Sequence, residues 1–377
     1  MNAFSITLPR QIRFGRGEAA KAAAFVADLG RSGLVVHGAK PERIAWLLRD
    51  LAQEGLSIST IAIAQEPDLP ALKAALARDL KVDWVLAIGG GSVLDMGKAL
   101  AALLPAKGDV MCHLEVVGQG LPLEAAPLPF VALPTTAGTG AEATRNAVIA
   151  LPEQGRKVSL RDSAMLPALA IIDPALSDNS PRAVTLASGL DAITQVIEPY
   201  ISCKSNLFSD ALALPALGQG LGALAQLMQG ENAIARDTMA WVSLCGGMAL
   251  ANAGLGAVHG LAGVIGGRFA APHGAICGIL LGPVLAENHA ASSGDTRARI
   301  EAVFAEIAAQ FGGAPQAAPQ TMLDWALFNG LPRLGHWGLR AEDLGAIASE
   351  AQASSSMKGN PFPLPDAALI RALRAAL

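Results

Sequence analysis

Short apolar runs alternate with helix-like stretches through the first half of the chain, and this alternation restricts the fold more than any other feature. Several of the runs end at glycine, proline or Asp-Pro, as buried strands often do. Strands that alternate with helices imply a mostly parallel sheet covered by helices on both faces. The expected strands span residues 33–36, 58–63, 84–88, 130–133 and 168–172. The expected helices span residues 18–29, 43–54 and 69–79.

The character of the sequence changes near Pro181. From there the chain is rich in Ala, Leu and Gly, with long helical stretches and few β-branched runs. The sequence therefore predicts an α/β domain at residues 1–178 and an all-helical domain at residues 179–377. Two domains also fit a length of 377 residues. A cleft between two such domains is a natural place for a cofactor to meet a substrate.

Charge and aromatic content argue against nucleic-acid binding. Lys and Arg number 28 against 32 Asp and Glu, which gives a net charge of −4. Aromatic residues make up 4% of the chain, with a single Tyr, so few side chains are available to stack on bases. Hydrophobic residues at 52% and charged residues at 16% favour large buried cores over disorder.

The mean hydropathy of +0.40 raises the question of a membrane protein. The most apolar region, residues 241–287, is interrupted by glycine pairs and prolines, which favours buried helices over membrane spans. The N-terminal segment lacks an apolar core of signal-peptide length. Four widely spaced cysteines without a CxxC pair predict reduced thiols, and together these features predict a cytoplasmic protein.

Two glycine-rich loops follow expected strands and predict a nucleotide site. The first, GGGSVLDMGKA at residues 89–99, lies where a buried strand passes into a helix. Glycine lets the backbone approach a phosphate closely, and the helix N-terminus attracts its negative charge. The second, PTTAGTGAE at residues 134–142, brings small hydroxyls and glycines to the same carboxyl edge of the sheet. The expected contacts are Gly90, Gly91, Ser92, Asp95, Thr135, Thr136 and Thr139.

With these loops, the sequence resembles the iron-containing (group III) alcohol dehydrogenase family. The resemblance continues in order through GLDAITQ at 189–195, VHGLA at 258–262 and PHG at 272–274. It implies a Rossmann-like dinucleotide-binding domain followed by a helical domain, an architecture like that of dehydroquinate synthase. It also implies a divalent metal in the cleft, Fe²⁺ before Zn²⁺ or Mn²⁺.

The resemblance assigns catalytic and metal-binding roles to Asp191, His259 and His273. The fourth metal position is Gln195, where the family has a histidine, and the family's additional cleft histidine is Gly263 here. Asp191 and Gln195 are spaced i and i+4, so they share one face of a helix. His259 and His273 are separated by Pro272 and glycines and must come from two elements. Gln195 offers an amide oxygen, a harder and usually weaker ligand than imidazole.

The segment after the first long strand bears on the choice between NAD and NADP. An acidic residue there often selects NAD, but Gly38 stands near that position and carries no carboxylate. Lys40 and Arg43 are placed to meet a 2′-phosphate, which slightly favours NADP. Lys157 resembles a family lysine near the cofactor's ribose.

The expected activity is the NAD(P)-dependent interconversion of a small neutral alcohol and its aldehyde or ketone. The helical domain is expected to present few cations to the substrate, chiefly Arg268 and Lys358. Two alternatives stay open: a metal-dependent lyase resembling 3-dehydroquinate synthase, and a non-catalytic dinucleotide-binding protein. Residues 3–8 alternate apolar and polar side chains, which predicts an edge strand that pairs two copies in a homodimer.

Overall fold

The computed structural model describes residues 3–106 and 108–377. The chain divides into two compact units. The α/β unit comprises Leu8–Thr136 and Ala141–Ser177, and the helical unit comprises Asp178–Leu377 with residues 3–7 and Ala137–Gly140. The boundary at residues 178 and 179, as a division into independently folding domains, stays a prediction.

A six-stranded parallel sheet forms the centre of the α/β unit, which confirms the fold expected from the alternating sequence. Its order is β1-β8-β5-β4-β2-β3. Its strands are β1 Ile12–Phe14, β2 Ser32–Gly38, β3 Ser57–Ile63, β4 Trp84–Gly89, β5 Phe130–Pro134 and β8 Leu169–Ile172. The α-helices of this unit are α1 Ala22–Ala27, α2 Ala45–Gln53, α3 Leu69–Leu76 and α4 Gly91–Leu103.

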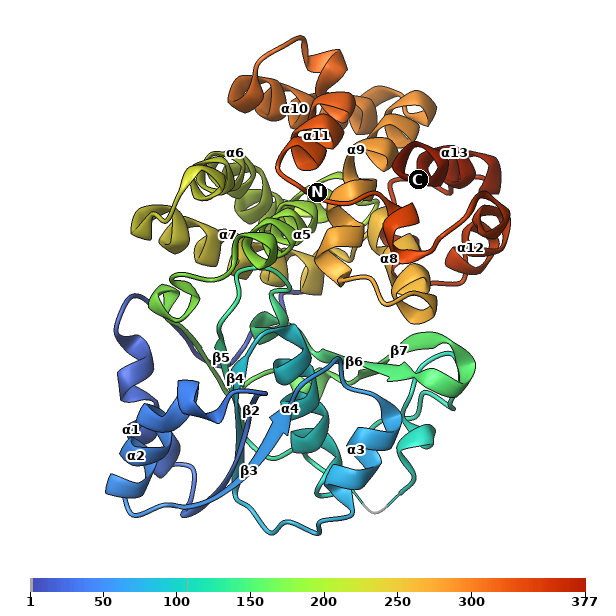
Figure 1. Ribbon diagram of the computed structural model, residues 1–377. Coiled ribbons are helices and arrows are strands. Elements are labelled where there is room, and N and C mark those ends of the chain that lie inside the picture. Colours follow the sequence, from blue (N-terminus) through green and yellow to red (C-terminus); the bar gives the residue numbers. More distant parts are fainter. Residues whose placement is uncertain (1–2, 107) are drawn as a thin grey trace. The chain divides into compact units, whose positions relative to one another are not determined.

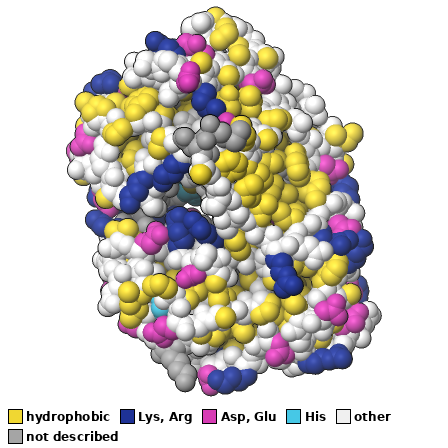
Figure 2. Space-filling model, turned by 180° about the vertical axis from the view of Figure 1, so that it is seen from behind, with side chains coloured by type: hydrophobic (Ala, Val, Ile, Leu, Met, Phe, Trp, Pro, Cys, Tyr) yellow, Lys and Arg dark blue, Asp and Glu magenta, His cyan; other side chains and the backbone are white. Residues whose placement is uncertain are grey.

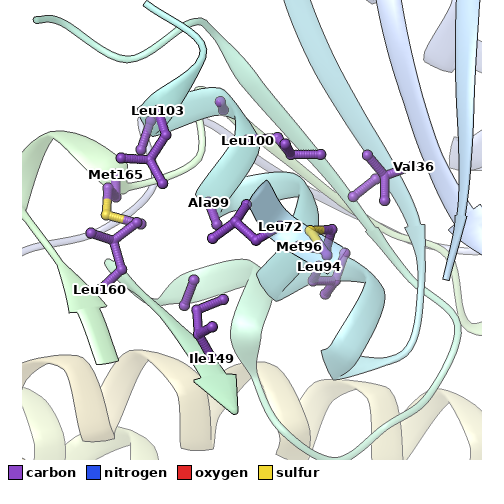
Figure 3. Close-up of a cluster of buried hydrophobic side chains, with 14 of the residues drawn as sticks. Val36, Leu72, Leu94, Met96, Ala99, Leu100, Leu103, Ile149, Leu160 and Met165 are labelled. Carbon is purple, nitrogen blue, oxygen red and sulfur yellow. The ribbon is translucent and has the colours of Figure 1, made fainter. Parts of the chain in front are cut away.

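Helices cover both faces of the sheet (Figure 1). On one face, α1 and α2 pack on a core that includes Val35, Trp84 and Leu86. On the other face, α3 and α4 pack on a second core, part of which Figure 3 shows around Leu72 and Leu100. Successive residues of β2 and β4 therefore enter opposite cores, because strand side chains alternate between the two faces.

The order of the strands places a topological switch point between β2 and β4. From β2 the chain moves outward to β3, then returns to the other side of β2 and continues through β4 and β5. The adjacent strands β2, β4 and β5 end at Gly38, Gly89 and Pro134. Their carboxyl ends lie side by side. In open α/β sheets, ligands bind at this edge and at this kind of position.

Two features of the α/β unit differ from the sequence expectations. An antiparallel hairpin of β6 Asn146–Leu151 and β7 Arg156–Arg161 stands apart from the main sheet and was not anticipated. Residues 3–8, which the sequence predicts to form an edge strand that pairs two copies, have no strand pairing within the single chain, whose first strand is β1. An edge strand forms only where another strand accepts its hydrogen bonds, so the homodimer prediction remains untested.

The helical unit is built around α5, a 20-residue helix that packs against α6, α7 and α9. Asparagine side chains cap the starts of α6 and α7, at Asn206 and Asn232. The helices are α5 Arg182–Ile201, α6 Leu207–Gln229, α7 Ala233–Ala253, α8 Ala257–Arg268, α9 His273–Ala291, α10 Gly294–Phe311, α11 Ala318–Phe328, α12 Leu344–Ala351 and α13 Asp366–Ala376.

One helix of this unit, α6, is long and apolar enough to cross a membrane, and α7 with α8 would make a second candidate if the pair counted as one span. The pair is bent by 100°, and half of the apolar window of α6 is buried against other helices. The sequence predicts buried helices for residues 241–287, and the helices there, α7, α8 and α9, bury most of their side chains. On the face shown in Figure 2, Lys and Arg lie in separate groups with Asp and Glu between them, without a continuous basic stripe.

Within the α/β unit, the side chain of Lys98 ties the second glycine-rich loop to α4. Its ammonium is buried and donates hydrogen bonds to the carbonyl oxygens of Ala141 (2.7 Å) and Asn146 (2.8 Å) and to Oγ1 of Thr144 (2.9 Å). Burial lowers the pKa of Lys98 to about 8, and burial raises the pKa of nearby Glu142 to about 7.

Replacing Lys98 with Met is expected to lower the free energy of unfolding by about 3 kcal/mol, because three buried acceptors lose their donor. The exposed Lys73, which pairs with Asp109 at 3.6 Å, provides the matched control. Lys73→Met is expected to cost less than about 1 kcal/mol. Urea unfolding followed by circular dichroism measures the free energy of unfolding of both variants. Equal losses would show that the buried hydrogen bonds of Lys98 stabilise the fold no more than the surface ion pair of Lys73 does.

Candidate active site

Three helices of the helical unit bring four potential metal ligands together. Asp191 lies in α5, His259 near the start of α8, and His273 and Cys277 in the first turns of α9. One ligand atom from each lies within 4.8 Å of the others. Nε2 of His259 is 3.3 Å from Oδ1 of Asp191, and Nε2 of His273 is 3.9 Å from the same oxygen. The sequence expectation that the two histidines converge from separate elements is therefore confirmed.

Glu198, one helical turn beyond Gln195 on α5, fixes the position of His259. Its carboxylate accepts a hydrogen bond from the backbone N–H of Val258 at 2.7 Å and one from Nδ1 of His259 at 2.6 Å. Nearby, Oδ1 of Asn360 accepts the N–H of Ala257 at 3.1 Å, so the start of α8 is held from two directions. With Nδ1 donating to Glu198, a neutral His259 presents the lone pair of its Nε2 toward Asp191 and toward any cation bound there.

Three buried polar atoms in this cluster have no hydrogen-bond partner. They are Oδ1 of Asp191, Oε1 of Gln195 and Nε2 of His259. Leaving such atoms unpaired in the interior is costly, and all three are lone-pair donors of the kind that bind a divalent metal. A histidine that donates its other ring nitrogen to a carboxylate is also the usual arrangement around a metal ligand. The residues present therefore fit a divalent metal.

The charges in the cluster reinforce one another. Burial alone would raise the pKa of Asp191, but the neighbouring His259 and His273 outweigh burial and hold it below the ordinary range. Burial would likewise lower the pKa of His259, yet Cys277, Glu198 and Asp191 raise it well above the ordinary value. His273 shifts upward for similar reasons, chiefly the proximity of Cys277. The site therefore attracts positive charge, for which protons and a metal ion compete.

Cys277 and Glu198 were missed by the sequence reasoning. Sγ of Cys277 is fully buried and lies 3.6 Å from Nε2 of His273. The signal was present, because His273 and Cys277 are spaced i and i+4 and helical residues at that spacing share a face. Glu198 follows Asp191 by seven residues, two turns along the same face of α5.

The two positions where the sequence resemblance implies histidine, Gln195 and Gly263, have different surroundings. Gln195 is 3% exposed, and a Cβ added to Gly246 of α7 would lie 3.0 Å from its Cβ, so α7 packs closely on this side chain. At Gly263, by contrast, an added Cβ would meet no atom within 4 Å. Packing in the helical unit therefore does not force a glycine at 263. Ligation of a metal by Gln195 stays a prediction.

The first glycine-rich loop lies at the switch point of the sheet. Glycine is needed by the fold at Gly89, where an added Cβ would lie 2.6 Å from Val93. At Gly90 the backbone is extended and an added Cβ would make only an ordinary 3.5 Å contact with Thr136. Gly91 and Ser92 begin α4, whose N-terminus has no side-chain cap. Uncapped N–H groups next to a glycine that the fold does not need are typical of a phosphate site.

The second loop contributes in two ways. The N–H of Thr135 donates to the carbonyl of Gly89 at 2.9 Å, which joins the two loops at the sheet edge. The loop tip, which contains Thr139, belongs to the helical unit. There an added Cβ on Gly138 would lie 2.8 Å from Ser188, and one on Gly140 would lie 2.5 Å from Gly247. The tip glycines are thus explained by close packing on α5 and α7.

The remaining expected cofactor residues are spread over the α/β unit. Asp95 accepts the N–H of Val148 at 3.1 Å, and Lys157 pairs with Glu66. Gly38 ends β2 at the switch point, where an added Cβ would meet no atom within 4 Å. Lys40 and Arg43, beyond it, are exposed. Direct contact of any of these residues with a cofactor stays a prediction.

Fold and site together are those of a metal-associated oxidoreductase, and comparison with known proteins gives the family. The family model described as "Iron-containing alcohol dehydrogenase" matches residues 9–174. The model described as "Fe-containing alcohol dehydrogenase family, C-terminal" matches residues 185–377. The chain belongs to the iron-containing alcohol dehydrogenase family, as its sequence motifs predicted.

Individual relatives agree with this assignment. Alcohol dehydrogenase 4 of Saccharomyces cerevisiae (strain YJM789) is 32% identical over 349 residues, which cover 90% of this chain and 87% of the yeast protein. Lactaldehyde reductase of Escherichia coli (strain K12) is 34% identical over 306 residues, 79% of this chain and 78% of its own. A crystal structure of 1,3-propanediol oxidoreductase superposes with a TM-score of 0.88 at 28% identity, covering 100% of both chains.

Replacing Glu198 with Gln is expected to weaken Zn²⁺ binding by about tenfold to a hundredfold, because the two hydrogen bonds go to separate carboxylate oxygens and the amide turns one of these acceptors into a donor. Glu287→Gln is the control, since Glu287 also lies on a helix of this unit but pairs only with Arg371 at its surface. Calorimetric titration with Zn²⁺ measures both. Unchanged affinity in Glu198→Gln would contradict the positioning role.

Proposed function

We propose that the chain is an NAD(P)-dependent oxidoreductase that interconverts a small neutral alcohol and its aldehyde or ketone. A divalent metal would be held by Asp191, His259 and His273, with Gln195 as the fourth position expected from the sequence. The unpaired buried atoms of Asp191 and His259 carry this proposal, because a bound cation satisfies both. When bound, the metal supplies a Lewis acid, and the nicotinamide supplies or accepts a hydride.

The chain's own residues have separate tasks in this reaction. Asp191 provides negative charge, His259 is held in one tautomer by Glu198, and His273 presents a side chain that is 34% exposed toward solvent. Gly263 supplies no imidazole for the proton, which in this proposal passes to water or to the ribose hydroxyls of the cofactor.

A neutral substrate is supported by the surroundings of the expected cations. Arg268 pairs with Glu350, which offsets its charge, and Lys358 is exposed. A substrate phosphate needs several available cations, and these two residues do not provide them. The relatives named lactaldehyde reductase and 1,3-propanediol oxidoreductase act, by their names, on small uncharged molecules.

We propose further that the dinucleotide binds at the ends of β2, β4 and β5, with its diphosphate against Gly90, Gly91 and Ser92. The switch point and the uncapped start of α4 support this placement. The preference for NADP over NAD depends on Lys40 and Arg43 alone and stays a prediction.

Replacing Gly90 with Val tests the cofactor site without disturbing the fold. The backbone conformation at Gly90 suits any residue, so the melting temperature is expected to stay within a few degrees of wild type, whereas NAD(P)H binding is expected to weaken at least about tenfold. Fluorescence titration with NADH and NADPH measures the affinity. Unchanged affinity in a folded variant would overturn the loop assignment.

Metal retention tests the proposed centre. After identical dialysis of Fe²⁺-loaded protein under anaerobic conditions, His273→Ala is expected to retain less metal per chain than wild type, because it loses an imidazole ligand. Gln195→His is expected to retain more, because it adds an imidazole to the face of α5 that carries Asp191. Turnover with an aldehyde panel is expected to follow metal content in His273→Ala.

The opposite pattern of metal retention would rule out the proposed metal centre. If Gln195→His retains no more metal than wild type and His273→Ala retains no less, these residues do not form a metal centre. Activity that persists in metal-free protein would then assign the hydride transfer to a site without a Lewis acid.

A further inference from the structure

We propose that Cys277 binds the metal through its thiolate, in the coordination position left by the histidine that Gln195 replaces, and makes the centre selective for zinc. This inference rests on the proposed function, because it assumes that Asp191, His259 and His273 hold a metal. It concerns the fourth ligand and the identity of the ion.

Two of the distances between donor atoms match those of a tetrahedral centre that includes sulfur, while Nε2 of His273 and Oδ1 of Asp191 are farther apart, at 3.9 Å. With Zn–S near 2.3 Å and Zn–N near 2.05 Å, a tetrahedral angle separates the two donors by about 3.5 Å. Sγ of Cys277 and Nε2 of His273 lie 3.6 Å apart. The same geometry gives about 3.4 Å for a nitrogen and an oxygen donor. Nε2 of His259 and Oδ1 of Asp191 lie 3.3 Å apart.

The position of the thiol in α9 supports the same conclusion. Cys277 follows His273 by one turn, so one helix delivers both donors to the cluster. Its side chain is 0% exposed, and Sγ lies within 4.8 Å of donor atoms of Asp191, His259 and His273. Three independent helices therefore surround one point with oxygen, two nitrogens and sulfur.

The two candidate fourth ligands differ in charge. Gln195 offers a neutral amide oxygen, whereas Cys277 offers a thiolate, which a divalent cation in a buried site attracts more strongly.

The donor set also decides which ion is preferred. Thiolate is a soft ligand that favours zinc over manganese, whereas an amide oxygen is a hard one. Zinc additionally tolerates expansion to five ligands, so four protein donors still leave the ion able to interact with a substrate. The iron that the family name suggests is therefore not the ion to which this donor set is best suited.

Cobalt substitution distinguishes sulfur from the other donors. Apoprotein loaded with Co²⁺ under anaerobic conditions is expected to show visible ligand-field bands together with a near-ultraviolet thiolate-to-cobalt charge-transfer band. The near-ultraviolet band is expected to disappear in Cys277→Ser and Cys277→Ala and to persist in Gln195→Ala. Cys203→Ser is the matched control, because Cys203 is an exposed cysteine of the same unit.

Each of the other possible cobalt spectra would overturn a stated part of the proposal. Visible bands without the charge-transfer band in wild type would overturn Cys277 as a ligand and leave the proposed metal centre standing. A band that survives in both Cys277 variants would assign it to another cysteine and overturn the inference. No cobalt bands in any folded protein, as judged by circular dichroism, would overturn the metal centre of the proposed function as well.

Metal competition tests the selectivity. Cys277→Ser is expected to weaken Zn²⁺ binding by about a hundredfold or more and to weaken Mn²⁺ binding much less. This loss of zinc affinity exceeds the one typical of a residue that only hydrogen-bonds to a metal ligand. Equal losses for the two ions, measured by chelator competition, would overturn the claim that Cys277 sets the choice of metal.

Discussion

The carboxylate of Glu198 is the contact on which the candidate centre depends. It accepts the N–H of Val258, which anchors the start of α8, and the N–H of the His259 ring, which fixes the tautomer. Both effects come from one buried side chain on α5, the helix that also carries Asp191. If the carboxylate were absent, His259 would be free to turn its protonated nitrogen toward Asp191 and hydrogen-bond to it, and the lone pair needed for a metal would be lost.

Glycines in the chain serve two distinct purposes, and the structure separates them. At Gly89, Gly138 and Gly140 any side chain would collide with neighbouring atoms, so the packing of the chain itself requires glycine. At Gly90 and Gly38 the space is available. The second group lies at the switch point of the sheet, the position where ligands bind in open α/β sheets.

The sequence resemblance implies histidines at the positions of Gln195 and Gly263, and the structure shows what surrounds each. Gln195 is a buried amide against α7, and the buried thiol of Cys277 lies 3.6 Å from Nε2 of His273. At Gly263 an added Cβ would meet no atom within 4 Å, so packing around the backbone does not itself require glycine there. The ion that the candidate centre prefers depends on the donors that this chain presents.

The sequence by itself determined the parallel sheet, the glycine-rich turn from strand to helix at residues 89–92 and, through its resemblance to the family, the grouping of Asp191 with two histidines. Those features depend on local periodicity and on ordered motifs, which are readable along the chain. Only the tertiary structure decided that Cys277 and Glu198 join the centre, that Lys157 pairs with Glu66, and that residues 3–8 form no strand within the chain. These outcomes depend on which helices and strands meet in space, and residues as far apart as Glu198 and His259 come together only when α5 and α8 pack.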